Sequence, residues 1–172
     1  MSGLACRTAL LLTVGVVLML GLSPEAEGQK TGQVEVRVTD HRAGIGDFTA
    51  FRVKLAEVSL HPRGQPRGQG WVEVIRHAAA VDIVPLKDGR WVMVGQGSVA
   101  AARYDAVRVR FGAIRAVLRH GGLAEAVPFG STIAVDLTIE LGTTRVVLID
   151  LYVEDQTDDA SGRYALKVQA VH

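Results

Sequence analysis

The stretch Tyr104–Phe111 reads Y-D-A-V-R-V-R-F and decides the fold. Its apolar members alternate with its arginines, in the order Val107, Arg108, Val109, Arg110. Because successive side chains of a β-strand point to opposite faces, this order places apolar groups on one face and guanidinium groups on the other. The stretch therefore predicts a half-buried strand, with one face on a core and the other in water.

The same alternation recurs along the chain, with turn residues between the segments. We predict strands over residues 34–39, 48–61, 71–75, 81–86, 91–94, 104–111, 114–119, 125–128, 133–141, 145–153 and 164–171. Within 48–61 the alternation slips near Ala56 and Glu57, which predicts a β-bulge there. Short strands at regular spacing are typical of a single antiparallel β-sandwich of about seven to nine strands, immunoglobulin-like or transthyretin-like.

Three segments carry more specific expectations. Ala100–Leu118 is rich in Ala and Arg, so a basic amphipathic helix is the alternative there. The strict alternation favours a strand, preceded by a short helical turn at Ser98–Arg103. The alternation of Ile133–Leu141 predicts five inward side chains, namely Ile133, Val135, Leu137, Ile139 and Leu141. Arg145–Val153 is apolar at almost every position, which indicates a central strand.

The N-terminus has the features of an export signal. Arg7 precedes the apolar run Ala9–Leu22, and Ala26–Gly28 supplies the small residues that a signal peptidase reads. The run is shorter than the roughly 20 residues of a membrane-spanning helix. We therefore predict a signal-peptide helix at 1–28 and a β-sandwich domain at 29–172, with an uncleaved membrane anchor as the alternative. The mature protein is then periplasmic or extracellular and has no membrane span.

Composition restricts the partners of the mature domain. The chain has a formal charge of +1, and removal of residues 1–28 takes away one arginine and two glutamates, leaving +2. This balance argues against nucleic acid as a partner. Cys6 is the only cysteine, so the mature domain has no disulfide and depends on its hydrophobic core.

The order of these segments resembles a family of exported prokaryotic domains known as domain of unknown function 4382. The motifs that carry the resemblance are V-E-V-R-V-T-D at 34–40, F-R-V-K-L-A-E-V-S-L-H-P at 51–62, G-W-V-E-V at 70–74, V-D-I-V-P-L-K-D-G at 81–89, A-R-Y-D-A-V-R-V-R-F at 102–111, V-P-F-G-S at 127–131 and Y-A-L-K-V at 164–168. The chain departs from the family pattern at His41-Arg42 and at Arg103. The resemblance implies an exported β-sandwich and carries over no catalytic residue.

One loop is a candidate metal site. It contains four carboxylates, Glu154, Asp155, Asp158 and Asp159. Ca²⁺ takes six to eight oxygen ligands, and clustered carboxylates supply several of them. A solvated turn is the more common role of such a loop, and the spacing of a helix-loop-helix calcium site is absent. No other cofactor is expected.

Two tryptophans are candidate ligand-binding residues. Trp71 and Trp91 each begin a predicted strand, where an indole can stack on a sugar or pack at the rim of the core. Six basic residues are expected on outward strand positions, namely Arg37, Arg52, Lys54, Arg108, Arg110 and Lys167. They form either a cationic face for an anionic polysaccharide or, more commonly in sheets, cross-strand ion pairs with outward carboxylates.

Catalytic patterns are weak. The five histidines, His41, His61, His77, His120 and His172, have no metal-binding spacing, and we expect them on the surface or at strand ends. No serine stands in a nucleophile elbow. We therefore expect a non-enzymatic binding or structural accessory module of the cell envelope or extracellular space. Its partner is a polysaccharide or an envelope protein, or it assembles by edge-strand pairing. A secreted hydrolase acting on a surface polymer is the alternative.

Overall fold

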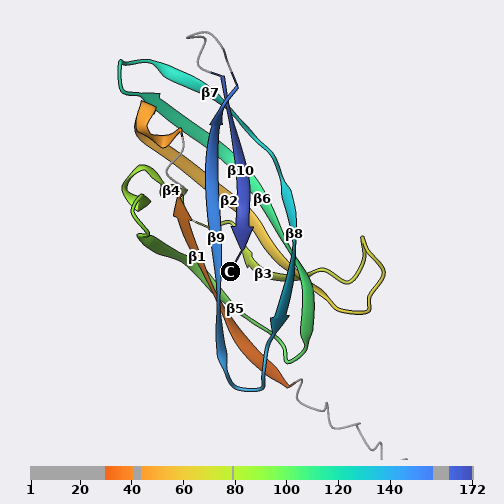
Figure 1. The fold of residues 1–172 in the computed structure, drawn as a ribbon. Coiled ribbons are helices and arrows are strands. Elements are labelled where there is room, and N and C mark those ends of the chain that lie inside the picture. The colour runs from red at the N-terminus through yellow and green to blue at the C-terminus, as the bar shows by residue number, and fades with distance from the viewer. Residues whose placement is uncertain (1–29, 41–43, 79, 157–162, 172) are drawn as a thin grey trace, which may run out of the picture.

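The computed structural model describes residues 30–40, 44–78, 80–156 and 163–171, and this part of the chain is all-β (Figure 1). Its strands are β1 (Thr31–Asp40), β2 (Phe48–Pro62), β3 (Val72–Arg76), β4 (Ala80–Asp82), β5 (Trp91–Ala100), β6 (Arg103–Leu118), β7 (Leu123–Pro128), β8 (Ser131–Thr138), β9 (Thr144–Asp155) and β10 (Arg163–Val171). Two 3-10 turns, η1 (Ile45–Asp47) and η2 (Val84–Leu86), are its only helical segments. Among these residues no helix has the length and apolar character needed to span a bilayer. The all-β prediction is confirmed, whereas the predicted signal peptide lies outside the described residues.

One continuous hydrogen-bonding path joins most of the strands, in the order β3-β2-β6-β7-β10-β9-β1-β5. β4 also pairs with β2, and β8 with β6. The two ends of the path meet, because a methyl group at Gly97 of β5 would collide with the carbonyl of Val74 in β3. The sheet is therefore a nearly closed, barrel-like body, and its division into the two layers of a sandwich stays a prediction.

The direction of two strand pairs differs from the prediction. β1 pairs with β9 in parallel, and so does β7 with β10, whereas the remaining pairs are antiparallel. The expectation of a wholly antiparallel sheet is therefore wrong. The physical reason is that side-chain alternation shows which face of a strand is buried but carries no information on the direction of its neighbour.

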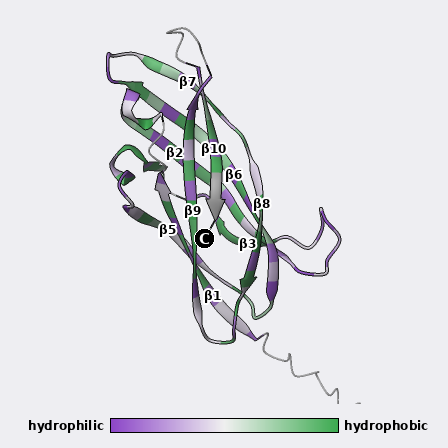
Figure 2. Cartoon of the chain, viewed as in Figure 1, coloured by the Kyte–Doolittle hydropathy of each residue, from purple (hydrophilic) through white to green (hydrophobic). Residues whose placement is uncertain are grey.

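The core lies inside this curved sheet. In β1 every second residue is buried, and Val34, Val36 and Val38 have no exposed surface. An aromatic cluster closes the core beside them, since the ring of Phe48 meets the rings of Phe51 and Tyr164 edge-on at 4.9 and 4.6 Å. Figure 2 shows the resulting alternation of hydrophobic and hydrophilic residues along the strands.

β2 and β6 form the longest pair, which extends from Phe48 opposite Leu118 to Pro62 opposite Tyr104. The register shifts between Leu55 and Glu57, so the predicted β-bulge is confirmed. The shift keeps the apolar residues before and after it on the core side, where Phe51, Val53, Leu55, Val58 and Leu60 are at most 1% exposed.

Several boundaries differ from the predictions. The helical turn expected at Ser98–Arg103 is wrong, because β5 continues as a strand to Ala100 through its ladder with β1. The helix alternative for Ala100–Leu118 is wrong as well, since β6 occupies most of it. The strand expected over 81–86 ends at Asp82, and the 3-10 turn η2 follows. Pro85 cannot donate a ladder hydrogen bond, which explains the early end.

β8 is also shorter than predicted. It ends at Thr138, and the chain then turns back toward β9. Ile139 is buried as expected, but Leu141 is 60% exposed, so its inward placement is wrong. The alternation persists in the sequence after the ladder has ended. β9 is central as predicted, because it lies between β10 and β1.

Candidate functional site

A pocket of about 430 Å³ opens on the outer face of β6 and β8, beside the loop that joins β2 to β3. Arg108 stands opposite Thr132, and Ala106 opposite Ala134, so β6 and β8 present these residues on one face. The other side chains that line the pocket come from β2, β6 and the loop, namely His61, Arg67, Trp71 and Asp105.

His61 is held from both ring nitrogens. Its Nδ1 lies 2.7 Å from Oδ1 of Asp105, and its Nε2 lies 3.3 Å from the carbonyl oxygen of Pro66. The hydrogen bond to Asp105 is the main cause that raises the pKa of His61 above its ordinary value, against the opposing effect of burial. In its protonated form both N–H groups donate, so neither nitrogen is free to act as a general base.

His61 is only 3% exposed, so it is not a surface residue, but it stands at the end of β2. His77 and His120 are exposed as expected. His41 and His172 lie outside the described residues. The partner of His61 is 44 residues away in the chain. No spacing rule reveals such a pair, because it depends on the register of β2 against β6.

Trp71 forms the aromatic wall of the pocket. Its ring lies 5.1 Å from the imidazole ring of His61, at a tilt of 56°. The guanidinium carbon of Arg108 lies 4.4 Å from the centre of a Trp71 ring, which is a cation–π contact. The indole is therefore fixed in position before any ligand arrives.

Trp91 lies in a different part of the sheet. It begins β5 opposite Thr39 of β1 and is 48% exposed. The guanidinium carbon of Arg37 lies 3.6 Å from the centre of its ring. Within the described part of the chain no ring contact joins Trp91 to Trp71. The structure therefore places the two tryptophans with separate neighbours, and their role in ligand binding stays a prediction.

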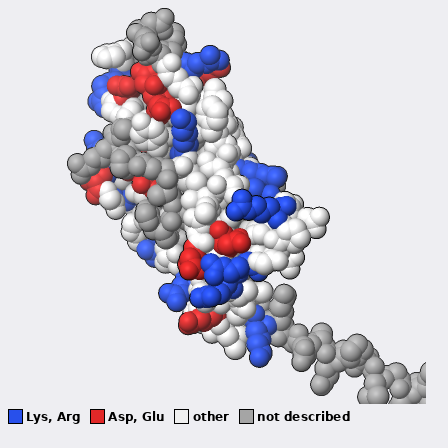
Figure 3. Space-filling view, turned by 45° about the vertical axis from the view of Figure 1, so that its right-hand side comes forward, with Lys and Arg blue, Asp and Glu red and all other residues white. Residues whose placement is uncertain are grey.

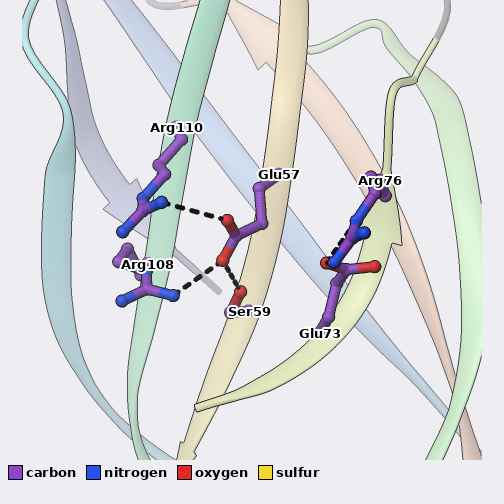
Figure 4. Close-up of polar contacts among 6 residues, drawn as sticks. All are labelled: Glu57, Ser59, Glu73, Arg76, Arg108 and Arg110. Atoms are coloured by element: carbon purple, nitrogen blue, oxygen red, sulfur yellow. Dashed lines mark hydrogen bonds and ion pairs between the residues drawn. The ribbon is translucent and has the colours of Figure 1, made fainter. Parts of the chain in front are cut away.

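Glu57 is the centre of an ion-pair network next to the pocket (Figure 4). Its carboxylate accepts from Arg108 at 2.7 Å, faces Arg110 at 3.4 Å and accepts from the hydroxyl of Ser59. The hydrogen bonds from Ser59 and Arg108 lower the pKa of Glu57. On the neighbouring strand Arg76 pairs with Glu73 at 2.6 Å.

Most of the predicted outward basic residues take part in such pairs. Arg52 lies 4.0 Å from Asp82, and the other pairs outside the Glu57 network are Arg37 with Glu35 and Lys167 with Glu154. The prediction of cross-strand ion pairs is confirmed for Arg52, Arg108, Arg110 and Lys167, whereas Arg37 pairs with a carboxylate of its own strand. Figure 3 shows the same mixing, with basic groups beside acidic ones over the visible face.

The predicted calcium loop is only partly described. The carboxylate of Glu154 accepts a hydrogen bond from Lys167 at 2.5 Å, and this bond lowers its pKa. Asp155 ends β9, whereas Asp158 and Asp159 lie outside the described residues. In the described ranges no three His, Cys, Asp or Glu residues are grouped to hold a metal ion. The calcium site stays a prediction.

Asp40 is a buried carboxylate that the sequence did not single out. It ends β1 on the core side and is 5% exposed. Among the described residues, neither of its carboxylate oxygens has a hydrogen-bond partner. Burial, followed by repulsion from Asp150, raises the pKa of Asp40 to about 7. The burial of Asp40 could have been predicted from the sequence, because Asp40 continues the alternating series of buried residues in β1.

The family model described as "Domain of unknown function (DUF4382)" matches residues 31–168. The chain belongs to this family. The resemblance inferred from the sequence motifs is confirmed, and the pocket of this DUF4382 domain lies entirely within the matched range. No curated protein and no solved structure matches the chain significantly.

Proposed function

We propose that this DUF4382 domain is an exported β-sandwich without enzymatic activity, which binds a sugar acid in the pocket beside Trp71. Export follows from the predicted signal peptide, and the site follows from the chemistry of the pocket walls. Small-molecule sites are concave, with apolar and aromatic surface and a few convergent polar groups. The pocket has this composition, because an indole stands next to guanidinium, hydroxyl and carboxylate groups.

The observation that carries the proposal is the position of Trp71 between charged neighbours. The ring offers apolar surface to the C–H groups of a sugar. Arg67 and Arg108 line the same pocket, and a guanidinium group binds a carboxylate through two parallel hydrogen bonds. His61 lies at the same wall, where its hydrogen bond with Asp105 raises the pKa of the imidazole. A uronate supplies both the apolar ring face and the carboxylate that these groups complement.

The pocket chemistry supports binding rather than hydrolysis. Glycoside hydrolysis uses two carboxyl groups roughly 5–10 Å apart, and the pocket lining within the described residues includes one, Asp105. That carboxylate is engaged by His61 at 2.7 Å. The meeting of β3 and β5 at the ends of the sheet also favours ligand binding over edge-strand assembly, because less free edge is available.

The test is calorimetric titration of the purified protein with galacturonate and glucuronate. We expect Trp71→Ala to weaken binding by about thirtyfold, the effect of truncating an aromatic hot spot worth about 2 kcal/mol. Trp91→Ala is the matched control, because Trp91 also lies beneath an arginine but does not line the pocket. Equal losses in both variants, or no binding by the unaltered protein, would refute the pocket. Release of sugars from a uronate polymer would refute the non-enzymatic assignment.

A further inference from the structure

Hollows lie along the β2–β6 pair in the described part of the chain, and the pocket at Trp71, of about 430 Å³, is larger than the two considered next. The second, of about 320 Å³, is lined by Arg76 and Arg110 among others. The third, of about 220 Å³, is lined by Arg52 and Arg115. Each hollow contains at least two cationic side chains, with Arg67 and Arg108 in the first. The hollows therefore lie along the same pair of strands and are all lined by arginine side chains.

The strand register places these arginines on one face. Arg52 stands opposite Arg115, and further along the pair Glu57 stands opposite Arg110 and Ser59 opposite Arg108. The apolar pairs that alternate with them, such as Val58 with Val109, are buried. The arginines consequently point away from the core. From Arg52 to His61 the strand covers roughly 30 Å at about 3.3 Å per residue.

The cations on this face reach further into solvent than the anions. In three of its ion pairs the exposed side-chain fractions of cation and anion are 63% and 31% (Arg52, Asp82), 59% and 19% (Arg110, Glu57), and 65% and 35% (Arg76, Glu73). In a fourth pair, Arg108 with Glu57, the fractions are nearly equal at 23% and 19%. The Arg63–Asp136 pair shows the reverse, with fractions of 45% and 68%. The length of the arginine side chain therefore does not by itself explain why the cations on this face are more exposed than the anions. A ligand approaching this face meets positive charge first.

One end of the face contains a like-charge pair. Arg52 and Arg115 are directly opposite each other on neighbouring strands, an arrangement that destabilises a sheet. Asp82 lies 4.0 Å from Arg52, at the limit of an ion pair, and no ion pair of Arg115 is found within the described residues. An anion held between the two guanidinium groups would remove this repulsion.

We infer that this outer face binds a linear polymer of sugar acids along the β2–β6 pair. We call it the arginine track and define it by Arg52, Arg76, Arg108, Arg110 and Arg115. Successive carboxylates of the polymer contact successive arginines, and one sugar unit occupies the pocket at Trp71. The inference rests on the proposed function for the class of sugar, while every track residue except Arg108 lies outside the pocket. A single aromatic group distinguishes the track from single-stranded nucleic acid sites, which stack successive bases on several.

The test compares four ligands on the full-length protein, namely galacturonate, an oligogalacturonate of about eight units, neutral dextran and single-stranded DNA. We expect the oligomer to bind more tightly than the monomer and to lose affinity with added salt. The double variant Arg52→Ser/Arg115→Ser should weaken oligomer binding by about tenfold at low salt and leave monomer binding unchanged. The charge-conserving variant Arg52→Lys/Arg115→Lys should retain most of the affinity.

Arg145→Ser is the control, since Arg145 is exposed on β9, away from the track. Thermal unfolding verifies that each variant folds. Equal binding of dextran, or an oligomer affinity unaffected by Arg52→Ser/Arg115→Ser, would overturn the track. Tighter binding of single-stranded DNA than of the oligomer would also overturn it. Arginine-dependent oligomer binding without any monomer binding would refute the Trp71 pocket and leave the track intact.

Discussion

Replacement of Asp40 by asparagine is expected to change the dependence of stability on pH. In the folded protein burial raises the pKa of Asp40 to about 7 from its ordinary value of 3.8, with Asp150 contributing repulsion. Within the part of the chain that the structure describes, no hydrogen-bond donor contacts the carboxyl oxygens to stabilise the ionised form. Unfolding exposes the side chain to water and restores the ordinary pKa. Asparagine remains neutral throughout this pH range.

The sign follows from the higher pKa of the folded state. Asp40 is protonated in both states below pH 3.8, and its stabilising contribution is complete there. As the pH rises toward 7 the unfolded state ionises first, so stability falls. The difference between a pKa of 3.8 and one of about 7 corresponds to a loss of about 4 kcal/mol once the pH exceeds 7. His61 acts in the same direction, because its pKa is also raised, but it is common to both proteins.

The assay is urea denaturation of the original protein and Asp40→Asn at intervals from about pH 4 to pH 8. We expect the free energy of unfolding of the original protein to fall by about 4 kcal/mol more than that of the variant. Asp136→Asn is the control, since the Asp136 side chain is 68% exposed and its surface ion pair contributes little. Parallel curves for the original protein and Asp40→Asn would refute a raised pKa at Asp40.

Three further changes test the fold and the predicted metal loop. Gly97→Ala should lower stability by about 1–3 kcal/mol, because its methyl group collides with the backbone of Val74, whereas Gly46→Ala, with open space around it, serves as control in the same denaturation assay. Tyr104→Phe should cost about 1 kcal/mol by thermal unfolding, since the buried hydroxyl donates to the carbonyl of Ala100 at 2.8 Å. EDTA should leave the Tm unchanged if the acidic loop is a solvated turn, and a clear drop would establish a bound cation.

Hydrophobic alternation recovered most of the strands because each of them buries one face. It also placed the β-bulge of β2, since a one-residue slip would otherwise have turned Val58 and Leu60 toward solvent. It could not give the parallel pairing of β1 with β9, which depends on the path of the intervening chain. It overextended β8 to Leu141, because a polar–apolar pattern continues past the last ladder hydrogen bond.

The candidate site was only half visible in the sequence. Trp71 and Arg108 were recognisable as a strand-start aromatic and an outward arginine, but nothing indicated that they touch. The His61–Asp105 pair depends on residues of two strands that meet only in the folded sheet. The sequence therefore supplied residue types, and the register of β2 against β6 supplied the site.

The two faces of the β2–β6 pair are under different requirements, because the inner face packs on the core and the outer face meets solvent. Its core face is satisfied by any well-packed set of apolar residues, and its outer face needs only polar groups for solubility. Balanced ion pairs would meet that need, yet this face exposes its arginines and sets Arg52 against Arg115. Because such an arrangement costs stability in the isolated domain, a requirement other than folding must maintain it. The proposed anionic ligand along these strands would supply that requirement, and the same charges would orient it on the sheet.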